Sequence, residues 1–219
     1  GDITVSSLGF VAYKPALFQQ LRTDIYKINA EQYKRSFYGC VEQMSRNFSE
    51  GRSDSFLYFT ADRKYVVKTV TKAEHHILLN LAVALKAHVE AYPQSLIIRI
   101  FGAYSVKMYG GMSYFAVFSN VFDAPPGFQI HAKYDLKGSS INRSTLPGSS
   151  LMKDLDFREA LCVSESQAST TLTQLDADTR FLRENGIMDY SLLLGVHYTV
   201  YTSDFDPYAF VGGGGGIKK

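Results

Sequence analysis

The sequence has few of the residues that mark several common classes of protein. It has two cysteines among 219 residues, Cys40 and Cys162, and they lack the close spacing of a metal site. Two thiols this far apart are typical of a protein from a reducing compartment rather than of a disulfide-stabilised secreted domain. No apolar run is long enough to cross a membrane, and the N-terminus has no signal-peptide pattern. We therefore expect an intracellular protein whose membrane contacts are peripheral.

Tryptophan is absent and the charges nearly cancel. The 23 basic and 21 acidic side chains leave a formal net charge of +2, which is too small to indicate binding of nucleic acid. The 46% hydrophobic and 20% charged residues are those of an ordinary globular protein. A chain of this length can form one large domain or two smaller lobes that share a cleft.

The first part of the chain predicts two helices. Pro15 begins the first, and apolar residues recur every four positions after it. The second begins at Asn29, where Gln32 can complete a capping box, and ends near Gly39. These helices could support a lobe or form a dimer contact, and the sequence leaves both open.

A β-hairpin follows a stretch of small residues at 49–55. Residues 56–60 and 65–70 alternate or are β-branched, and 61–64 form a turn between them. Backbone N–H groups of small residues can hold phosphate, although a stretch with one glycine, Gly51, is more typical of an ordinary surface turn. Lys68 lies in the second strand, where a kinase has its phosphate-binding lysine. The alternative is a solvent-facing strand lysine.

A long helix comes next, with Thr71 as its N-cap and Glu74 completing a capping box. Glu74 could also pair with Lys68, as the acidic residue of a kinase helix does. The helix ends before Pro93. Its predicted apolar stripe consists of Ile77, Leu78, Leu81, Leu85 and Val89.

A second hairpin leads to a break rich in proline and glycine. Residues 95–106 predict a strand that bends at Gly102, and residues 114–119 predict the returning strand. Asn120-Val121-Phe122 then enters the 123–127 break, which is typical of a hinge between lobes or of an ordinary surface loop.

Two basic residues flank small residues farther along. Lys137 and Arg143 lie on either side of Gly138-Ser139-Ser140, whose N–H groups could bind phosphate oxygens. The alternative is a strand exit with solvated basic side chains. A helix then begins with a capping box at Ser164. Its predicted inner face consists of Ala168, Leu172, Leu175 and Leu182.

Gly186 ends this helix, and Asp189 follows at the mouth of an apolar run. Residues 192–196 predict a strand that is buried on both faces. A carboxylate at the edge of such a strand is rigid and partly desolvated, which suits a catalytic base or a metal ligand. The alternative is an aspartate that caps the turn after Gly186.

Taken in order, these segments resemble the phosphatidylinositol phosphate kinase family, and in particular its phosphatidylinositol 4-phosphate 5-kinases. The resemblance runs from about Tyr13 to His197. It rests on Gly51-Arg52-Ser53-Asp54-Ser55-Phe56, Tyr65-Val66-Val67-Lys68-Thr69, Lys133-Tyr134-Asp135-Leu136-Lys137-Gly138-Ser139, Lys153-Asp154-Leu155-Asp156-Phe157 and Ile187-Met188-Asp189-Tyr190-Ser191-Leu192-Leu193.

The resemblance implies an α+β fold with antiparallel sheets and packed helices. This is the two-lobed lipid-kinase fold, related to that of SAICAR synthase and distantly to protein kinases. The N-terminal lobe would comprise residues 1–120 with the phosphate loop and the strand lysine. The C-terminal lobe would comprise residues 121–219 and end in a flexible glycine-rich segment.

The resemblance also implies a role for each candidate residue, with ATP and Mg²⁺ as cofactors. Asp189 would orient or deprotonate the inositol hydroxyl, or help to hold Mg²⁺. Lys68 would hold the α- and β-phosphates, Lys137 would meet ATP phosphate or transition-state charge, and Arg143 would bind the phosphate already on the lipid. The phosphate loop would be Gly51, Arg52, Ser53, Ser55 and Phe56, and the adenine hinge would be Asn120, Val121 and Phe122.

The sequence departs from the family pattern at two places. Asp54 stands where a small residue is common, and a carboxylate near ATP phosphates would weaken binding. In the family, an Ile-Ile-Asp segment with the second metal aspartate follows the region of His197, and nothing here matches it. Asp204 and Asp206 are present, but no apolar strand precedes them. We expect that the chain is a fragment of a longer protein; the alternative is a kinase-like protein without chemistry.

The resemblance predicts a kinase that makes phosphatidylinositol 4,5-bisphosphate from the 4-phosphate lipid. The alternatives are a phosphatidylinositol 5-phosphate 4-kinase and a non-catalytic scaffold of the same fold. A protein kinase is disfavoured, because no His-Arg-Asp or Asp-Phe-Gly element is present. We expect a cytoplasmic protein that touches the anionic cytosolic face of membranes, with a possible homodimer and no nucleic-acid partner.

Overall fold

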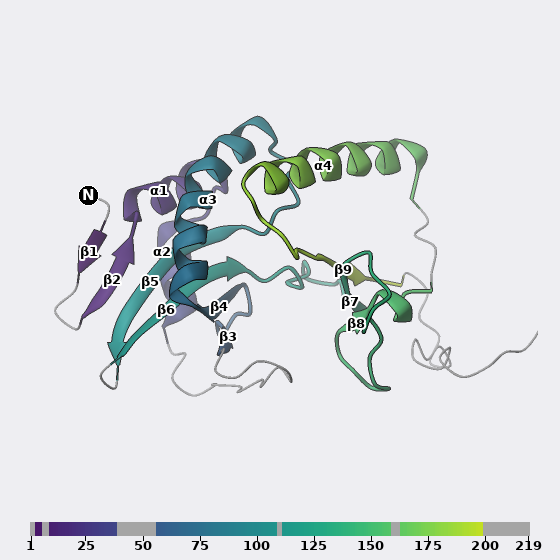
Figure 1. Ribbon diagram of the computed structural model, residues 1–219, viewed down its shortest axis with the longest axis horizontal. Helices are drawn as coiled ribbons and strands as arrows, with labels where there is room; N and C mark the ends of the chain where they lie inside the picture. Colours follow the sequence, from purple (N-terminus) through teal and green to yellow (C-terminus); the bar gives the residue numbers. More distant parts are fainter. Residues whose placement is uncertain (1–2, 6–8, 39–55, 109–110, 159–162, 199–219) are drawn as a thin grey trace, which may run out of the picture. The chain divides into compact units, whose positions relative to one another are not determined.

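The computed structural model describes residues 3–5, 9–38, 56–108, 111–158 and 163–198. The helical elements are α1 (Pro15–Gln20), the π-helical turn η1 (Leu21–Ile25), α2 (Ala30–Phe37), α3 (Lys72–Ala91), the 3₁₀ turn η3 (Asp154–Asp156) and α4 (Glu165–Glu184). The strands are β1 (Ile3–Val5), β2 (Phe10–Tyr13), β3 (Leu57–Phe59), β4 (Tyr65–Val70), β5 (Ile100–Met108), β6 (Gly111–Ser119), β7 (Ala132–Leu136), β8 (Met152–Lys153) and β9 (Leu192–Val196) (Figure 1).

The contacts divide the chain into two units. The first unit contains residues up to Asn120 together with residues 169–185, and the second contains residues 121–168 and those from Gly186 onward. The sequence places 169–185 in the C-terminal lobe, so this grouping differs from that expectation. The physical reason is that Asp178 and Phe181 of α4 pack against α3, where Phe181 joins the core of the first unit.

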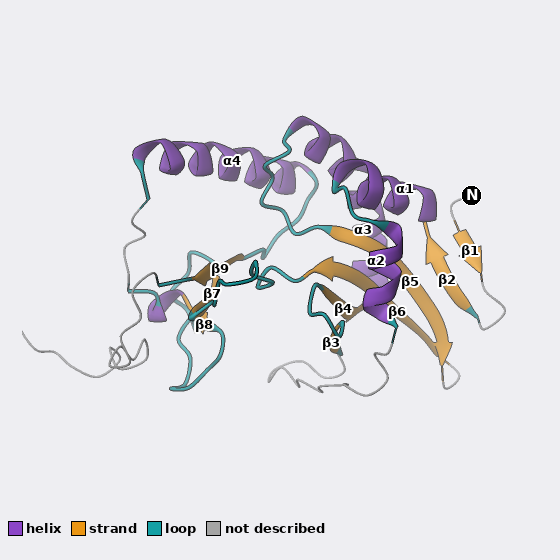
Figure 2. Ribbon diagram, turned by 180° about the vertical axis from the view of Figure 1, so that it is seen from behind, coloured by secondary structure: helices purple, strands orange, loops and turns teal. Residues whose placement is uncertain are grey.

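The first unit is built on a six-stranded antiparallel sheet in the order β1-β2-β5-β6-β4-β3. The predicted hairpin is present as β3 and β4, which are shown beside β6 in Figure 2. One face of the sheet packs against α1, η1 and α3, and the other packs against α2. These two faces form separate cores, the first around Leu21, Leu85 and Ala116 and the second around Tyr65, Phe101 and Val117.

Strand β5 begins at Ile100, five residues later than the sequence predicts. The pairing with β6 shifts between Ile100 and Gly102, which is a β-bulge. A Cβ at position 102 would lie 2.3 Å from the Tyr104 hydroxyl, so any residue other than glycine would require the Tyr104 ring to move. Before Ile100, the carbonyl of Arg99 still accepts from the backbone N–H of Ser119, whereas Ser95 and Leu96 bind the carboxylate of Asp178.

The apolar stripe of α3 differs by one position from the prediction. Leu78, Leu85 and Val89 are buried as expected, whereas Ile77 is 51% exposed. Ala82 takes the remaining position in the core at 0% exposure. Successive helix positions are rotated by about 100°, so Ile77 and Leu78 cannot both lie in the centre of one stripe.

The second unit contains a three-stranded sheet in the order β8-β7-β9. β7 pairs with β9 in the antiparallel direction and with β8 in the parallel direction. Its core consists of Ala132, Tyr134 and Met152. β9 lies at an edge of the described sheet, and Leu192 is 40% exposed, so the expected burial of this strand on both faces is wrong.

The helices of both units bear on whether the chain could cross a membrane. None of those that the structure describes combines the length and the apolar composition needed to cross a membrane. The architecture is therefore the predicted α+β class of mainly antiparallel sheets with packed helices.

Candidate functional site

The second unit brings Lys137 and Asp189 together. Lys137 follows β7 and Asp189 precedes β9, and the register pairs Leu136 with Leu192 at this end of the two strands. Lys137 Nζ donates to Asp189 Oδ1 at 2.5 Å. Two residues that are 52 positions apart in the chain thus form one ion pair at the end of a strand pair.

Asp189 has an exposed side chain and an unusual backbone. Its φ of +58° lies in the left-handed region, which aspartate tolerates better than most residues. The side chain is 82% exposed, so the expectation of a partly desolvated carboxylate is wrong. Asp189 lies before the first residue of β9, in the turn that follows Gly186, and it is not part of the core around Ala132, Tyr134 and Met152. The carboxylate can therefore be reached by a substrate.

Asp154 organises the loop that carries Lys137. Its Oδ1 accepts hydrogen bonds from the backbone N–H of Lys137 at 2.8 Å and of Gly138 at 2.7 Å. Gly138 has a φ of +69°, so it turns the chain in a conformation that suits glycine. The backbone N–H groups of Lys137 and Gly138 are therefore bound to Asp154 and are not directed at a phosphate.

Arg143 completes this arrangement from inside. It is 9% exposed, and its Nε donates to Asp154 Oδ2 at 2.7 Å. Its Nη2 donates to the backbone carbonyl and to Oδ1 of Asp135. The alternative of a solvated basic side chain at this position is therefore wrong, because Arg143 is enclosed by two carboxylates of its own unit.

The pKa of Asp154 reflects these contacts. The hydrogen bond from Arg143 holds the pKa of the Asp154 carboxyl well below its usual range, against desolvation, which raises it. The backbone N–H groups of Gly138 and Lys137 lower it further. Asp154 therefore stays ionised at neutral pH and acts as a fixed acceptor.

Asp156 braces the same loop on its other side. Its Oδ2 accepts from Thr145 Oγ1 at 2.9 Å and from the backbone N–H of Lys153 at 3.0 Å. The sequence alone indicates no role for Asp154 or Asp156. The signal was present in the Lys-Asp-Leu-Asp-Phe stretch, whose two carboxylates are spaced to accept from neighbouring backbone groups.

In the first unit, Lys68 lies in the middle of β4 and is exposed. It pairs with Leu57 of β3 and with Ala116 of β6, and Ala116 in turn pairs with Ala103. Directly opposed residues share a face of the sheet, so Lys68 is on the face that packs against α3. Of its two direct partners on that face, Ala116 is small and buried, whereas Leu57 is larger and half-buried.

The predicted capping box at the start of α3 is present. Thr71 Oγ1 accepts from the backbone N–H of Glu74, and Glu74 Oε2 accepts from the backbone N–H of Thr71 at 2.7 Å. Glu74 thus has the capping role that the sequence offers as one of its two alternatives.

Most of the predicted phosphate loop lies outside the described residues, including Gly51, Arg52, Ser53 and Ser55. Phe56 is described and is 59% exposed, and its backbone N–H donates to Thr69 Oγ1 at 2.7 Å. Phe56, which precedes β3, is therefore hydrogen-bonded to β4.

The three predicted hinge residues have different contacts. Asn120 ends the first unit, where its Nδ2 donates to the carbonyl of Arg63 at 2.6 Å. Val121 and Phe122 belong to the second unit, where the Phe122 ring lies 5.1 Å from Lys133 Nζ. The hinge prediction thus falls where the chain passes from one unit to the other.

The described residues offer little to hold a metal by themselves. No group of three or more histidine, cysteine, aspartate or glutamate side chains gathers among them in a metal-binding arrangement. Mg²⁺ is commonly bound by one or two carboxylates together with phosphate oxygens and water. An exposed carboxylate such as Asp189 fits one ligand of such an ion, with the others supplied by a nucleotide.

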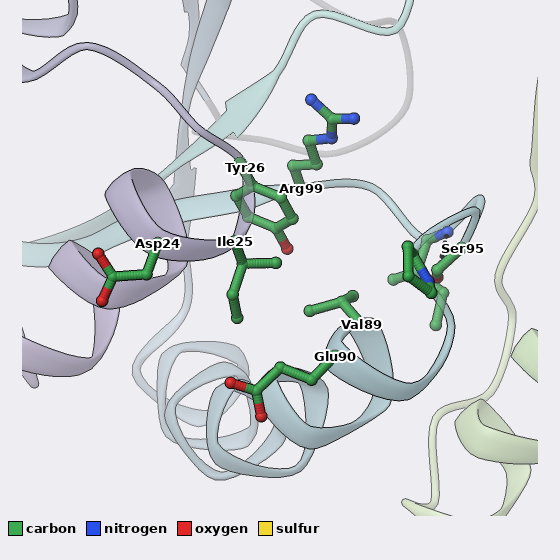
Figure 3. Close-up of a pocket in the computed structure, with 9 residues that line it drawn as sticks. Asp24, Ile25, Tyr26, Val89, Glu90, Ser95 and Arg99 are labelled. Atoms are coloured by element: carbon green, nitrogen blue, oxygen red, sulfur yellow. Dashed lines mark hydrogen bonds between the residues drawn. The ribbon is translucent and has the colours of Figure 1, made fainter.

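A cavity of about 350 Å³ lies elsewhere in the first unit. Figure 3 shows Ile25, Tyr26 and Val89 around it, with Glu90 and Asp24 near its edges. None of the residues that line it is a predicted site residue. The candidate active-site residues therefore do not depend on this cavity.

Comparison with known proteins identifies what these motifs belong to. A family model described as "Phosphatidylinositol-4-phosphate 5-Kinase" matches residues 38–206. Phosphatidylinositol 4-phosphate 5-kinase 5 of Arabidopsis thaliana is 34% identical over 197 residues, which cover 85% of this chain and 25% of that protein. Phosphatidylinositol 4-phosphate 5-kinase of Plasmodium falciparum is 32% identical over 220 residues, which cover 89% of this chain and 13% of that protein.

A third relative comes from another lineage. A probable phosphatidylinositol phosphate kinase of Dictyostelium discoideum is 31% identical over 202 residues, or 86% of this chain and 28% of that protein. The chain spans about a quarter or less of the length of most of these relatives. Because the family model covers well over half of the sequence, the chain belongs to the phosphatidylinositol-4-phosphate 5-kinase family.

Proposed function

We propose that this chain is part of an enzyme that transfers the γ-phosphate of ATP to phosphatidylinositol 4-phosphate, giving phosphatidylinositol 4,5-bisphosphate. The observation that supports the proposal most directly is the ion pair of Lys137 and Asp189 at the end of β7 and β9. Phosphoryl transfer requires positive charge at the phosphates and a positioned acceptor for the proton of the nucleophile, and this pair supplies one group of each kind.

In the proposed reaction, Asp189 accepts the proton of the inositol hydroxyl. The hydroxyl oxygen forms a bond to the γ-phosphorus while the bond from that phosphorus to the β-phosphate oxygen breaks, and ADP leaves. Lys137 stabilises the negative charge on the transferring group. An incoming phosphate competes with Asp189 for the Lys137 ammonium, and this competition leaves more of the exposed carboxylate available to the hydroxyl.

In this proposal, Lys68 of the first unit binds ATP. It holds the α- and β-phosphates from β4, where its partner on β6, Ala116, is buried and small. Asn120, Val121 and Phe122 line the adenine, and the loop at 51–56 covers the phosphates. Asp189 would be one ligand of Mg²⁺, which would neutralise charge at the phosphates.

The enclosed position of Arg143 modifies one part of this proposal. Its Nε and Nη2 donate to Asp154 and Asp135, so the loop that follows β7 is fixed by Arg143 from within. We propose that any contact of Arg143 with the lipid phosphate is secondary to this support. The names of the relatives favour the 4-phosphate lipid as substrate over the 5-phosphate lipid.

The membrane contact in this proposal is peripheral, on the cytosolic face. The substrate is part of a lipid, and basic residues near an anionic surface contribute about 1 kcal/mol each to binding.

The test is product formation by the complete protein with ATP and Mg²⁺. Vesicles would carry the 4-phosphate, the 5-phosphate or unphosphorylated phosphatidylinositol, and the product isomer would be resolved. We expect the 4,5-bisphosphate from the 4-phosphate lipid. The same product from the 5-phosphate lipid alone would make the protein a 4-kinase. Silence on all three lipids, with the protein shown to be folded, would favour a non-catalytic scaffold.

A further inference from the structure

A buried carboxylate outside the candidate active site fastens α4 to α3. Asp178 is 3% exposed, and its Oδ1 lies 2.7 Å from His88 Nε2, 2.8 Å from Ser95 Oγ and 2.9 Å from Gln174 Nε2. Its Oδ2 accepts from the backbone N–H of Leu96 at 2.7 Å. We call Asp178 with His88, Ser95 and Leu96 the Asp178 clasp. Three of its four contacts join α4 to a segment more than 80 residues earlier in the chain.

The clasp lies in the only part of α4 that is buried. From Glu165 to Thr173 every residue is exposed except Ala168, which is half-buried. Burial begins at Gln174 and reaches its maximum at Asp178 and Phe181, and the Phe181 ring stacks on His88 with centroids 4.3 Å apart. The end of α4 is therefore fixed to α3 while its beginning is not.

Stability alone does not explain a carboxylate at this position. Burying a charge costs free energy, and an apolar residue of similar volume often gives equal or greater stability. A carboxylate adds geometric specificity, because four donors must be placed so that all of them reach its two oxygens. The clasp thus fixes the rotation and the axial position of α4, which a purely apolar contact would fix less sharply.

The end of α4 determines where the chain leaves for Asp189. Asn185 remains attached to the helix, since its backbone N–H and its Nδ2 both donate to the carbonyl of Phe181. Gly186, with a φ of +69°, then turns the chain into the second unit. Asp189 is four residues beyond Asn185. Little chain is available to absorb a displacement of the helix end.

We propose that Asp178 is a positioning residue for the reaction, an inference that rests on the proposed function. The clasp fixes the end of α4 to the unit that carries Lys68, and this end sets the starting point of the segment that carries Asp189. A loosened clasp lets this starting point move. The chemical step then slows, while the contacts of Lys68 with ATP stay as they are.

The first variant is Asp178→Asn, with Asp176→Asn as its matched control. Asparagine turns one acceptor into a donor, so at least one of the donors around residue 178 loses its partner. Asp176 is on the same helix, but its ion pair with Arg180 is exposed. We expect kcat to fall about tenfold to a hundredfold in Asp178→Asn, as small misplacements of reacting groups do, with the KM for ATP nearly unchanged. Asp176→Asn should match the wild type.

Two variants at His88 separate positioning from packing. His88→Gln keeps an N–H donor for Asp178 and loses the ring that stacks on Phe181, whereas His88→Phe keeps a ring and loses the donor. If the clasp positions α4, His88→Gln should retain most of kcat and His88→Phe should lose it. The reverse order would overturn the proposal and assign His88 a packing role. This pair also decides the question if Asp178→Asn does not fold.

Amide hydrogen exchange of residues 182–190 in the same variants provides a readout that is independent of activity. We expect faster exchange there in Asp178→Asn than in Asp176→Asn. If the wild type makes product and Asp178→Asn keeps its kcat, the positioning role is refuted. If the wild type makes no product, the proposed function fails, and unchanged exchange would show that the clasp does not hold this segment either.

Discussion

At the scale of single residues, two aspartates of the second unit use the same carboxylate in opposite ways. Asp189 is exposed and pairs with one lysine, whereas Asp154 accepts from Arg143 and from two backbone N–H groups. The first arrangement leaves the carboxylate open to a substrate. In the second arrangement, both carboxylate oxygens accept hydrogen bonds within the protein and fix the loop that contains Lys137.

Replacing Asp189 with asparagine should abolish turnover in the complete enzyme without unfolding it. The amide cannot accept the hydroxyl proton, and loss of a general base costs about 10² to 10⁴ in rate. Asparagine also tolerates the left-handed backbone at this position, where φ is +58°. Product formation and thermal unfolding would be measured together. Near-normal turnover would remove Asp189 from the catalytic residues.

Replacing Lys68 with alanine should raise the KM for ATP, because the α- and β-phosphates lose a cation. Lys107→Ala is the matched control, since Lys107 is an exposed lysine in β5 of the same sheet. Steady-state kinetics with varied ATP would be compared for both variants. Unchanged KM and kcat in Lys68→Ala would disprove the role assigned to this residue.

The lowered pKa of Asp154 predicts a pH dependence of stability. The unfolded chain takes up a proton near the ordinary pKa of 3.8, while the folded chain does so only at lower pH. The contribution of Asp154 to the free energy of unfolding is therefore complete above this value and is lost as the pH falls below it. Urea unfolding from pH 6 down to pH 3 would compare the wild type with Asp154→Asn. The difference between them should shrink with acid, and a difference that grows would contradict the assignment.

At the scale of elements, helix ends are fixed by local contacts, and α3 provides the clearest case. Thr71 and Glu74 satisfy each other's backbone N–H groups before the helix turns inward. This cap aligns the first turn of the helix that lies over the face of the sheet containing Lys68.

Thr71→Ala should lower the free energy of unfolding by about 1 kcal/mol, the usual cost of losing an N-cap. Thr173→Ala is a suitable control. Thr173 is exposed within α4, where its hydroxyl bonds to the carbonyl of Ser169, so its loss should be nearly neutral. Denaturant unfolding of both variants tests this, and equal losses would show that the cap contributes nothing specific.

At the scale of the whole molecule, α4 belongs to the first unit from Ser169 onward, although the chain before and after 169–185 belongs to the second. Its stability should therefore follow that of α3 and not that of the β7–β9 sheet. Phe181 and Asp178 of α4 are buried in this unit, and the half-buried Leu182 packs against the same core.

Leu85→Ala provides the test. Leu85 is 0% exposed in the core that Phe181 joins, so its truncation should cost about 2–5 kcal/mol. Amide exchange should accelerate together in α3 and in residues 174–182, but less in β7. Ile77→Ala, on the exposed side of the same helix, should change neither. Exchange in α4 that stays unchanged in Leu85→Ala would show that the helix folds apart from the first unit.

The sequence alone determined the local features, which depend only on residues a few positions apart. The capping boxes at Thr71 and Ser164, the turn between β3 and β4 and the end of α4 at Gly186 are all as predicted. Each depends on contacts three or four residues apart or on the backbone freedom of glycine. The α+β class and the family also follow from short motifs in order.

Only the tertiary structure decided how distant groups meet. Arg143 is enclosed by Asp135 and Asp154, Lys137 meets Asp189 across 52 positions, and Asp178 meets His88 across 90. Periodicity could not choose between Ile77 and Ala82 for the core, because apolar character alone does not say which side of a helix will face a sheet. Charge and burial depend on partners far along the chain, and those partners are set by packing, which no local pattern contains.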